Sequence, residues 1–315
     1  MLAPETLMAN SDPTIRAAYA ECRRIARRHY ENFPTASLLV PRDRRNALAA
    51  IYAFARYADD LADEPGVEGR LEKLAEWRAK LADCCAGKVD HPVFIALRHS
   101  IDTYRISEVH FQNLLRAFEQ DVLVNRRPDF ASVLSYCTNS ANPVGRLVLE
   151  LFGHRDPELF ALSDNICTGL QLTNFWQDVA VDLDRDRVYL PLADLQRFGL
   201  TLENLRKFML PDGSAPDERW RQLMAFEISR TREFFHQGRA LPEKVKPQLR
   251  LQLRLTWLGG MEILEKIESA RYDVFRRRPS LGRWDFLKLY FRARRNRLGP
   301  QGESRNSAAT VASRR

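Results

Sequence analysis

The chain has 315 residues, of which 45% are hydrophobic, 29% are charged and only 14 are glycine, and its formal net charge is +8. This composition excludes collagen-like, rod-like coiled-coil and wholly disordered proteins, and it favours a soluble helical protein over a turn-rich β protein. The length is compatible with one large domain or two modest ones, and we expect one.

Cysteine usage and hydropathy limit the cellular compartments in which the protein is expected. The five cysteines form no CxxC pair and no regular framework, and the chain opens without a basic-then-apolar signal segment. No window of the sequence reaches the ~18 to 20 consecutive apolar residues that a membrane span needs. We therefore expect a cytoplasmic protein whose contact with lipid, if any, is peripheral and at the inner face of the membrane.

Helix signals follow one another along the chain, and alternating strand patterns are nearly absent. Capping residues or prolines that suit a first helical turn stand at Asp90 to Pro92, Ser107, Asp129, Asp156 to Glu158 and Pro216 to Glu218. These signals predict about ten helices. No repeat or linker divides the chain, so we expect one all-α domain over residues 14–292, preceded by a frayed segment, 1–13.

The stretch AIYAFARYADDLADEP, residues 50–65, places four acids in six positions of an apolar helical run. Asp59 and Asp63 are four residues apart and share one helical face. Like charges at this spacing repel each other by a few tenths of a kcal/mol, so a cation should offset them. Arg56 is one candidate. Mg²⁺ is the other, because paired aspartates hold this ion against substrate phosphates.

A second acidic run is GLQLTNFWQDVAVDLDRDRVYLP, residues 169–191. Asn174, Asp178 and Asp182 recur every four residues and are predicted to line one stripe of a helix. The run ends in an arginine and a tyrosine that could donate to a phosphate. Either stripe alone is more often a solvated helix face. Both are embedded in apolar residues, where unpaired carboxylates are costly, so the pair of stripes favours a metal site.

The positive charge gathers near the C-terminal end. Residues 271–297 hold ten Lys and Arg side chains against two Asp, and residues 298–315 add a further excess of two. This end could be a solvated face, or it could contact anionic lipid headgroups. No nucleic-acid partner is expected, because no zinc finger, RNP or helix-turn-helix signature accompanies the charge. Residues 293–315 are predicted to form a basic, disordered tail.

Together the two acidic runs resemble those of the squalene and phytoene synthases, the head-to-head branch of the trans-isoprenyl diphosphate synthases. The resemblance extends from about Ala18 to about Glu268. It implies an all-α isoprenoid synthase fold, a single helical bundle domain with a central active-site cavity. It also implies that two facing helices hold about three Mg²⁺ ions around a prenyl diphosphate.

The resemblance further implies roles for individual residues. Catalytic roles fall on Asp59, Asp63, Asp178 and Asp182, and the implied metal ligands are these four and Asn174. The implied substrate-binding residues are His29, Tyr30, Phe33, Tyr52, Arg56, Asn142, Gln171, Arg187 and Tyr189. Candidate walls of an apolar tunnel for the hydrocarbon are Phe33, Phe54, Phe175 and Trp176.

Within the family, the segments RRHYENFPTASLLVP and SANPVGRLVLELFG look like the subgroup from bacterial hopanoid pathways that makes hydroxysqualene from presqualene diphosphate. Ordinary squalene and phytoene synthases usually carry a Ser-Lys or Ser-Arg pair after the histidine, whereas His29 is followed by Tyr30 and Glu31. Losing that cation puts in doubt the condensation step, which must hold two diphosphates together. The subgroup implies Mg²⁺-dependent ionisation, cation rearrangement and capture of water, with no nicotinamide.

Two other functions stay open. One is a presqualene diphosphate, squalene or phytoene synthase that condenses two prenyl diphosphates. The other is a non-catalytic assembly or scaffold relative, which should have lost carboxylates from its stripes, whereas all four aspartates stand here. The expected partners are a prenyl diphosphate substrate, an anionic membrane surface and other hopanoid-pathway enzymes.

Overall fold

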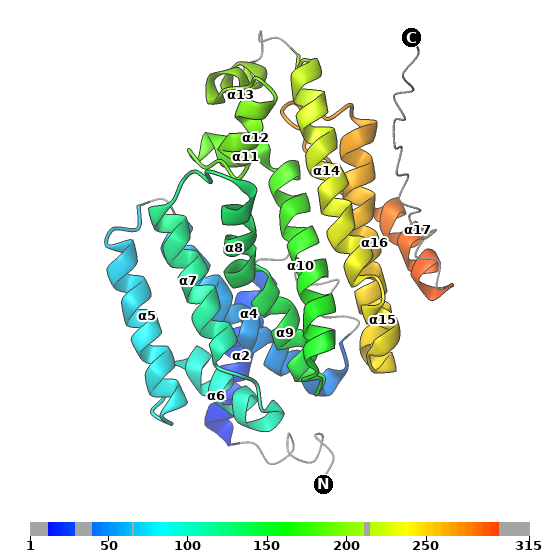
Figure 1. Ribbon diagram of the computed structural model, residues 1–315. Helices are drawn as coiled ribbons and strands as arrows, with labels where there is room; N and C mark the ends of the chain where they lie inside the picture. Colours follow the sequence, from blue (N-terminus) through cyan, green and yellow to red (C-terminus); the bar gives the residue numbers. More distant parts are fainter. Residues whose placement is uncertain (1–11, 29–39, 65, 211–214, 296–315) are drawn as a thin grey trace, which may run out of the picture.

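The structure, a computed structural model, describes residues 12–28, 40–64, 66–210 and 215–295. Within these ranges every regular element is a helix, and β structure is limited to one isolated bridge between Arg126 and Val188. The prediction of an all-α protein is confirmed (Figure 1). No helix in the described part of the chain is both long enough and apolar enough to cross a membrane.

The helices follow one another with short connections. In chain order they are α2 (Pro13–Arg28), α4 (Arg42–Asp63), α5 (Arg70–Cys85), α6 (Pro92–Tyr104), α7 (Val109–Leu123), α8 (Phe130–Ser140), α9 (Asn142–Leu151), α10 (Pro157–Gln177), α11 (Val179–Asp184), α12 (Leu192–Arg197), α13 (Leu202–Met209), α14 (Glu218–Gly238), α15 (Leu241–Lys244), α16 (Pro247–Ser269) and α17 (Arg283–Arg294).

The predicted helix starts coincide with observed ones. Four of them carry side chains that accept a hydrogen bond from a first-turn amide, namely His91, Asp129, Asp156 and Asp217. The fifth start, α7, follows Glu108 without a side-chain cap. The described residues form fifteen helices rather than about ten, because α11, α12, α13 and α15 are short segments of four to eight residues between the long ones. Such short segments have too few residues to display a helical period.

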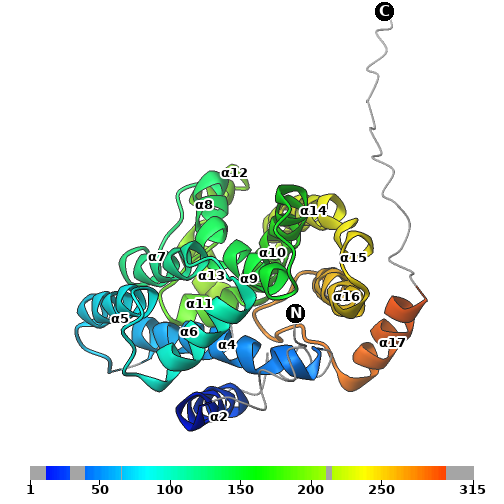
Figure 2. The same cartoon turned by 90° about the horizontal axis from the view of Figure 1, so that it is seen from below.

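The two helices that begin or carry the acidic runs, α4 and α10, both pack inside the bundle. Helix α10 packs mainly against α14 and α9, and α4 packs mainly against α2, α6 and α7. Helix α9 contacts both α4 and α10. Seen from below, α14 and α16 lie on one side of α10, and α7 and α5 lie on the other (Figure 2). Each acidic run is therefore fixed by neighbours on several sides.

A glycine allows α10 and α14 to approach closely. A Cβ atom placed on Gly238 would lie 2.5 Å from Cγ1 of Ile166 and 2.8 Å from the carbonyl oxygen of Leu162. The second of these atoms belongs to the backbone of α10 and cannot move aside cheaply. Gly238 therefore sets the spacing between α14 and the helix that leads into the second acidic run.

Candidate active site

The first acidic run lies at the C-terminal end of α4, which ends at Asp63 and has no basic residue in its last turn. Carboxylates are unfavourable there, because the helix dipole places partial negative charge at that end. Arg56 offsets part of this charge through Nη1 to Asp59 at 3.0 Å and through Nη2 to Asp60 at 2.6 Å. Since this placement costs stability, a functional reason for the acids is favoured over a structural one.

The second acidic run is not one continuous helix, and this part of the sequence prediction was wrong. Helix α10 ends at Gln177, Asp178 caps it with φ −105° and ψ 14°, and α11 begins at Val179. The hydrogen bonds still follow a helical path, because the amide of Asp178 donates to Asn174 O at 2.9 Å and that of Asp182 donates to Asp178 O at 2.8 Å. The stripe is therefore kept in register but is bent at Asp178.

Arg187 connects the two runs. The chain turns back after α11 through Asp186, which has φ 55°, and the guanidinium of Arg187 then reaches α4. It donates to the two oxygens of Asp63 at 2.9 and 2.6 Å. It also donates to the carbonyl oxygen of Asp121 at 3.3 Å. Predicted residues from the two runs are thus in contact across 124 positions of sequence.

A third acid joins this group, and sequence reasoning missed it. Asp121, near the end of α7, is buried and accepts hydrogen bonds from Tyr189 at 3.0 Å and from Tyr136 at 2.7 Å. Burial raises the pKa of Asp121 above its usual value. The sequence does contain a sign that Asp121 is buried. It follows Phe118 by three residues and Leu114 by seven, which puts this acid on the apolar face of its helix.

One carboxylate in each run has a raised pKa. Burial raises the pKa of Asp59 to about 6, and the neighbouring charge of Asp63 adds to the effect. Burial likewise raises the pKa of Asp182 to about 7, with a contribution from Asp178. Such shifts indicate anions that lack full compensation, which is typical of functional sites.

Mg²⁺ is the cation that these carboxylates were predicted to hold. In the described ranges no group of three or more Asp, Glu, His or Cys side chains is placed to hold a metal ion. Arginines contact two of the carboxylates, Arg187 on Asp63 and Arg278 on Asp178. The donor chemistry still fits a hard divalent cation, because Asp59 and Asp182 are undercompensated carboxylates and Mg²⁺ prefers oxygen ligands.

Arg278 belongs to the basic end of the chain, yet it serves the candidate active site. Its Nη2 donates to Asp178 at 3.1 Å, and its Nε also contacts that carboxylate. The adjacent Gln177 donates to the carbonyl oxygen of Pro279. The segment between α16 and α17 is therefore tied to the bend at the end of α10. Part of the positive charge that the sequence assigned to a solvated or lipid-facing surface neutralises an aspartate.

A cavity of about 570 Å³ lies beside the second run. Its residues come from α8 to α10, from α16 and from α17, and they include Leu170, Gln171, Asn174, Gln177, Leu255, Ile263, Leu281, Phe286 and Leu289. The predicted residues Gln171 and Asn174 thus face a largely apolar space. This volume lies within the ~300 to 1,000 Å³ of pockets that hold one small-molecule ligand.

Other predicted residues lie elsewhere. Asn142 is buried and its side-chain oxygen accepts a hydrogen bond from Thr168 at 3.0 Å, so it joins α9 to α10 and does not line the cavity. Tyr52 is half-buried on α4 beside Arg56, and burial raises its pKa. His29, Tyr30 and Phe33 lie outside the described residues.

The aromatic residues expected to line a tunnel belong to the core instead. Phe54 packs edge-on against Phe111, with ring centroids 5.2 Å apart. Trp176 is buried and donates to Thr231 at 2.8 Å. Phe175 stacks on Tyr189 at 3.9 Å. None of these three rings lines the large cavity, whose apolar walls are mainly aliphatic.

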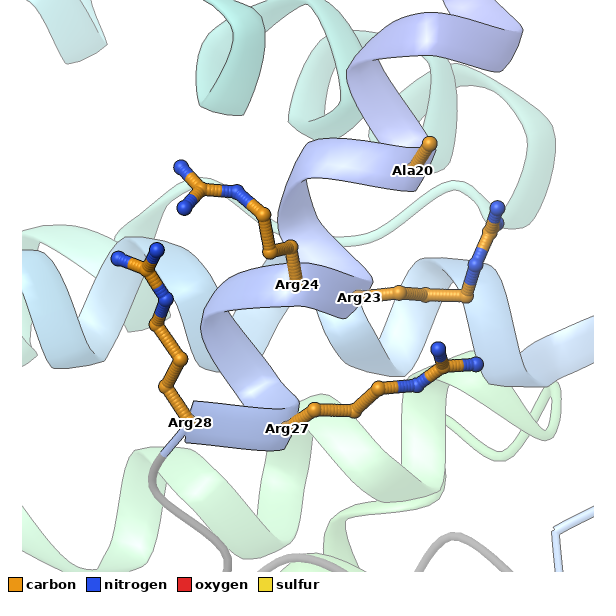
Figure 3. Close-up of a pocket in the computed structure, with 5 residues that line it drawn as sticks. All are labelled: Ala20, Arg23, Arg24, Arg27 and Arg28. Carbon is orange, nitrogen blue, oxygen red and sulfur yellow. The ribbon is translucent and has the colours of Figure 1, made fainter.

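A second hollow, of about 360 Å³, lies on α2 and is lined by four arginines and one alanine, Ala20, Arg23, Arg24, Arg27 and Arg28. Figure 3 shows Arg23 and Arg27 extending to one side of the helix and Arg24 and Arg28 to the other. Arg23 donates to Asn46 at 2.7 Å, and Arg24 pairs with Glu21. No residue of either acidic run lines this hollow, so it is not part of the candidate active site.

Comparison with known proteins agrees with this fold and identifies the family. Residues 26–285 match the family described as Squalene/phytoene synthase. The chain therefore belongs to the squalene/phytoene synthase family, whose members are enzymes of isoprenoid synthesis. The family predicted from the two acidic runs is confirmed.

The relatives include two kinds of enzyme. The 15-cis-phytoene synthase of Synechococcus elongatus is 29% identical over 286 residues, which is 86% of this chain and 90% of that protein. The hydroxysqualene synthase of Zymomonas mobilis is 36% identical over 184 residues, which is 56% of this chain and 60% of that protein.

Solved structures confirm the isoprenoid synthase fold. The squalene synthase HpnC from Alicyclobacillus acidocaldarius superposes with a TM-score of 0.78 at 38% identity, covering 84% of this chain and 98% of that one. A dehydrosqualene synthase solved with a ligand has a TM-score of 0.80 at 22% identity, covering 90% and 97% of the two chains. The second likeness concerns the fold alone.

Proposed function

We propose that this protein is an Mg²⁺-dependent hydroxysqualene synthase, which ionises presqualene diphosphate and captures the rearranged cation with water. The observation that carries the proposal is the convergence at Arg187, which joins Asp63 to the second acidic run. The choice of reaction is supported by the 36% identity to the Zymomonas mobilis enzyme and by the Tyr30 and Glu31 pair.

The donors for the diphosphate are Arg56, Arg187 and Tyr189. Each of the three lies beside a carboxylate: Arg56 by Asp59, Arg187 by Asp63 and Tyr189 by Asp121. When bound to the aspartates, Mg²⁺ supplies positive charge and Lewis acidity to a leaving diphosphate. The guanidinium groups orient the diphosphate oxygens, because a planar fork binds two oxygens at once.

The hydrocarbon end of the substrate fits the cavity. Side chains such as Leu170, Leu255 and Ile263 supply an apolar wall that excludes bulk water from the cation. Gln171 is one of several polar side chains in that wall, and we assign to it the role of holding the water that captures the cation. A largely apolar wall restricts the access of water to the cation, which favours a single defined product over random quenching by solvent.

A second candidate is condensation of two prenyl diphosphates, as in a phytoene synthase. The observation that favours it is coverage, since the Synechococcus elongatus enzyme matches over 90% of its length. A scaffold role is less well supported, because Asp59, Asp63, Asp178 and Asp182 are all kept. We also propose a cytoplasmic position at the inner face of an anionic membrane, beside other hopanoid-pathway enzymes.

The test uses purified protein, Mg²⁺ and presqualene diphosphate without nicotinamide. We expect release of diphosphate and a C30 alcohol whose oxygen comes from ¹⁸O-labelled water, and we expect NADPH to divert none of it to squalene. A chelator should stop the reaction and added Mg²⁺ should restore it. Efficient consumption of farnesyl or geranylgeranyl diphosphate by the unaltered protein would overturn the assignment in favour of condensation.

A further inference from the structure

Helix α17 (Arg283–Arg294) carries apolar side chains on two opposite faces. Leu289 and Ala293 are fully buried against the body of the protein. Trp284, Leu287 and Phe291 are exposed, by 83%, 47% and 52%. These three stand three and four residues apart, so they share the opposite face of the helix. We call them the outer stripe.

The inner face of the same helix closes the large cavity. Phe286 and Leu289 line that cavity, together with Leu281 just before the helix. Phe286 is also 42% exposed, and Val144 on the α9 side of the lining is 47% exposed, so the cavity reaches the protein surface near both residues. In both overall views α17 lies at the periphery, beside α16 (Figures 1 and 2). Helix α17 is therefore the wall between the cavity and the outside.

Basic residues flank the outer stripe. Lys288 and Arg292 lie 3.6 and 3.4 Å from Glu262, which holds α17 on α16. Within the described part of the chain, Arg283, Arg294 and Arg295 form no ion pair with an acid, and Arg294 interacts with the hydroxyl and the ring of Tyr290. The exposed apolar stripe is thus bordered by uncompensated positive charge.

This combination points to a lipid surface. The 12 residues of α17 span roughly 18 Å, which is shorter than the ~30 Å hydrocarbon core, so the helix would lie in the plane of the interface. Apolar and aromatic side chains flanked by Lys and Arg are typical of interfacial helices. A second copy of this chain would instead bring two basic borders together, which is electrostatically unfavourable.

We propose that α17 is an interfacial docking helix, whose outer stripe enters the boundary between headgroups and acyl chains of an anionic phospholipid membrane. Docking in this orientation brings the surface opening near Phe286 close to the bilayer, on the side of α17 that is set back from the outer stripe. An apolar C30 chain can then pass between cavity and membrane without crossing water. This last step rests on the proposed function, whereas the docking rests on α17 itself.

Trp284 is a built-in probe. The other four tryptophans, Trp77, Trp176, Trp220 and Trp257, are buried, so quenchers that reach only the protein surface act on Trp284. With vesicles of phosphatidylcholine and phosphatidylglycerol we expect a blue shift of its emission and quenching by brominated lipid. Vesicles of phosphatidylcholine alone, or high salt, should weaken both effects at least fivefold.

Two variants separate the apolar and the charged contributions. Leu287→Ser with Phe291→Ser removes most of the stripe, and Arg294→Glu with Arg295→Glu reverses the border. Each should weaken vesicle sedimentation at least tenfold. The matched control is Leu123→Ser, which removes a leucine that is 65% exposed at the end of α7, and it should bind like the wild type. Far-UV circular dichroism checks that all three are folded.

Which face of α17 meets the membrane is tested by moving the tryptophan from position 284 to position 286. In the double variant Trp284→Phe with Phe286→Trp, the new indole lies on the cavity side of α17, set back from the outer stripe, and brominated lipid should quench it less strongly than Trp284. Equal quenching would mean that α17 leaves the protein body, which overturns the proposed wall. Absence of vesicle binding, or protection of Trp284 by self-association at rising protein concentration, would overturn docking. These measurements use no substrate, so they stand or fall separately from the turnover assay.

Discussion

Arg187 donates two hydrogen bonds to the carboxylate of Asp63, at 2.9 and 2.6 Å, and thereby connects the end of α4 to the segment that follows α11. The same guanidinium reaches the backbone of α7 at Asp121. A planar fork that binds two carboxylate oxygens fixes direction as well as distance. This single side chain therefore sets how far apart the two acidic runs stand.

Replacing Arg187 with lysine should lower kcat/KM for the diphosphate substrate by about 100-fold. Lysine keeps the positive charge but offers a point contact in place of the two-point one, so Asp63 and the second run lose their fixed separation. The control is Arg206→Lys. The Nη2 atom of Arg206 lies 3.2 Å from a carboxylate oxygen of Asp186, and both side chains are exposed, so this variant should keep near wild-type activity. Steady-state kinetics with both variants make the comparison. Activity of Arg187→Lys within threefold of the wild type would contradict this role.

Asp182 should make the stability of the metal-free protein depend on pH. Burial raises the pKa of Asp182 in the folded protein to about 7, well above its ordinary value of 3.8, so between these pH values the folded state holds a proton that the unfolded state has released. The contribution of Asp182 to stability therefore falls as the pH rises from about 4 to about 7. Asp182→Asn removes the charge, so the variant should melt at a higher temperature than the wild type at pH 8, with a smaller difference at pH 5.

The control for this pH dependence is Asp184→Asn, because Asp184 is exposed two residues further along the chain. Its effect on the melting temperature should be the same at both pH values. Thermal melts followed by circular dichroism in the presence of a chelator give the two differences. A stabilisation by Asp182→Asn that is equal at pH 5 and pH 8 would show that the Asp182 charge is not the cause.

Gly238→Ala should destabilise the protein by about 1 to 3 kcal/mol, because the added methyl group meets Ile166 and the backbone of Leu162. The matched control is Gly259→Ala on α16, where a Cβ atom would lie 3.6 Å from Leu281, an ordinary contact distance. There alanine should leave stability unchanged or raise it by up to ~1 kcal/mol, since it favours helix over glycine. Urea unfolding measures both. Equal effects at the two positions would refute the close packing of α10 on α14.

The sequence was informative wherever the relevant contact is local. The cap at Asp129 and the pairing of Arg56 with Asp59 both follow from helix geometry, in which residues three apart are neighbours. The family and its fold could be inferred because two acidic runs with apolar neighbours form a specific joint pattern.

Contacts between distant segments could not be read in the same way. The position of Asp121 beside Tyr189 depends on how α7 meets the chain after α11, and no local period encodes that. Arg278 was counted with a basic end, although folding brings it to an aspartate 100 residues away. The prediction that Phe54 and Trp176 line a tunnel was wrong for a related reason. An aromatic residue in an apolar helix face can pack in the core as well as line a tunnel, and both of these residues are buried in the core.

Two neighbouring residues at the end of α10 hold the segment that precedes α17: Asp178 through Arg278, and Gln177 through Pro279. Only the first contact involves a carboxylate that a bound cation would also use. A cation on Asp178 would therefore weaken its contact with Arg278 and leave the Gln177 contact intact, so the segment before α17 would be held less firmly. Occupancy of the acidic runs and freedom of the outer helix are then linked through a single guanidinium, and each would report on the other.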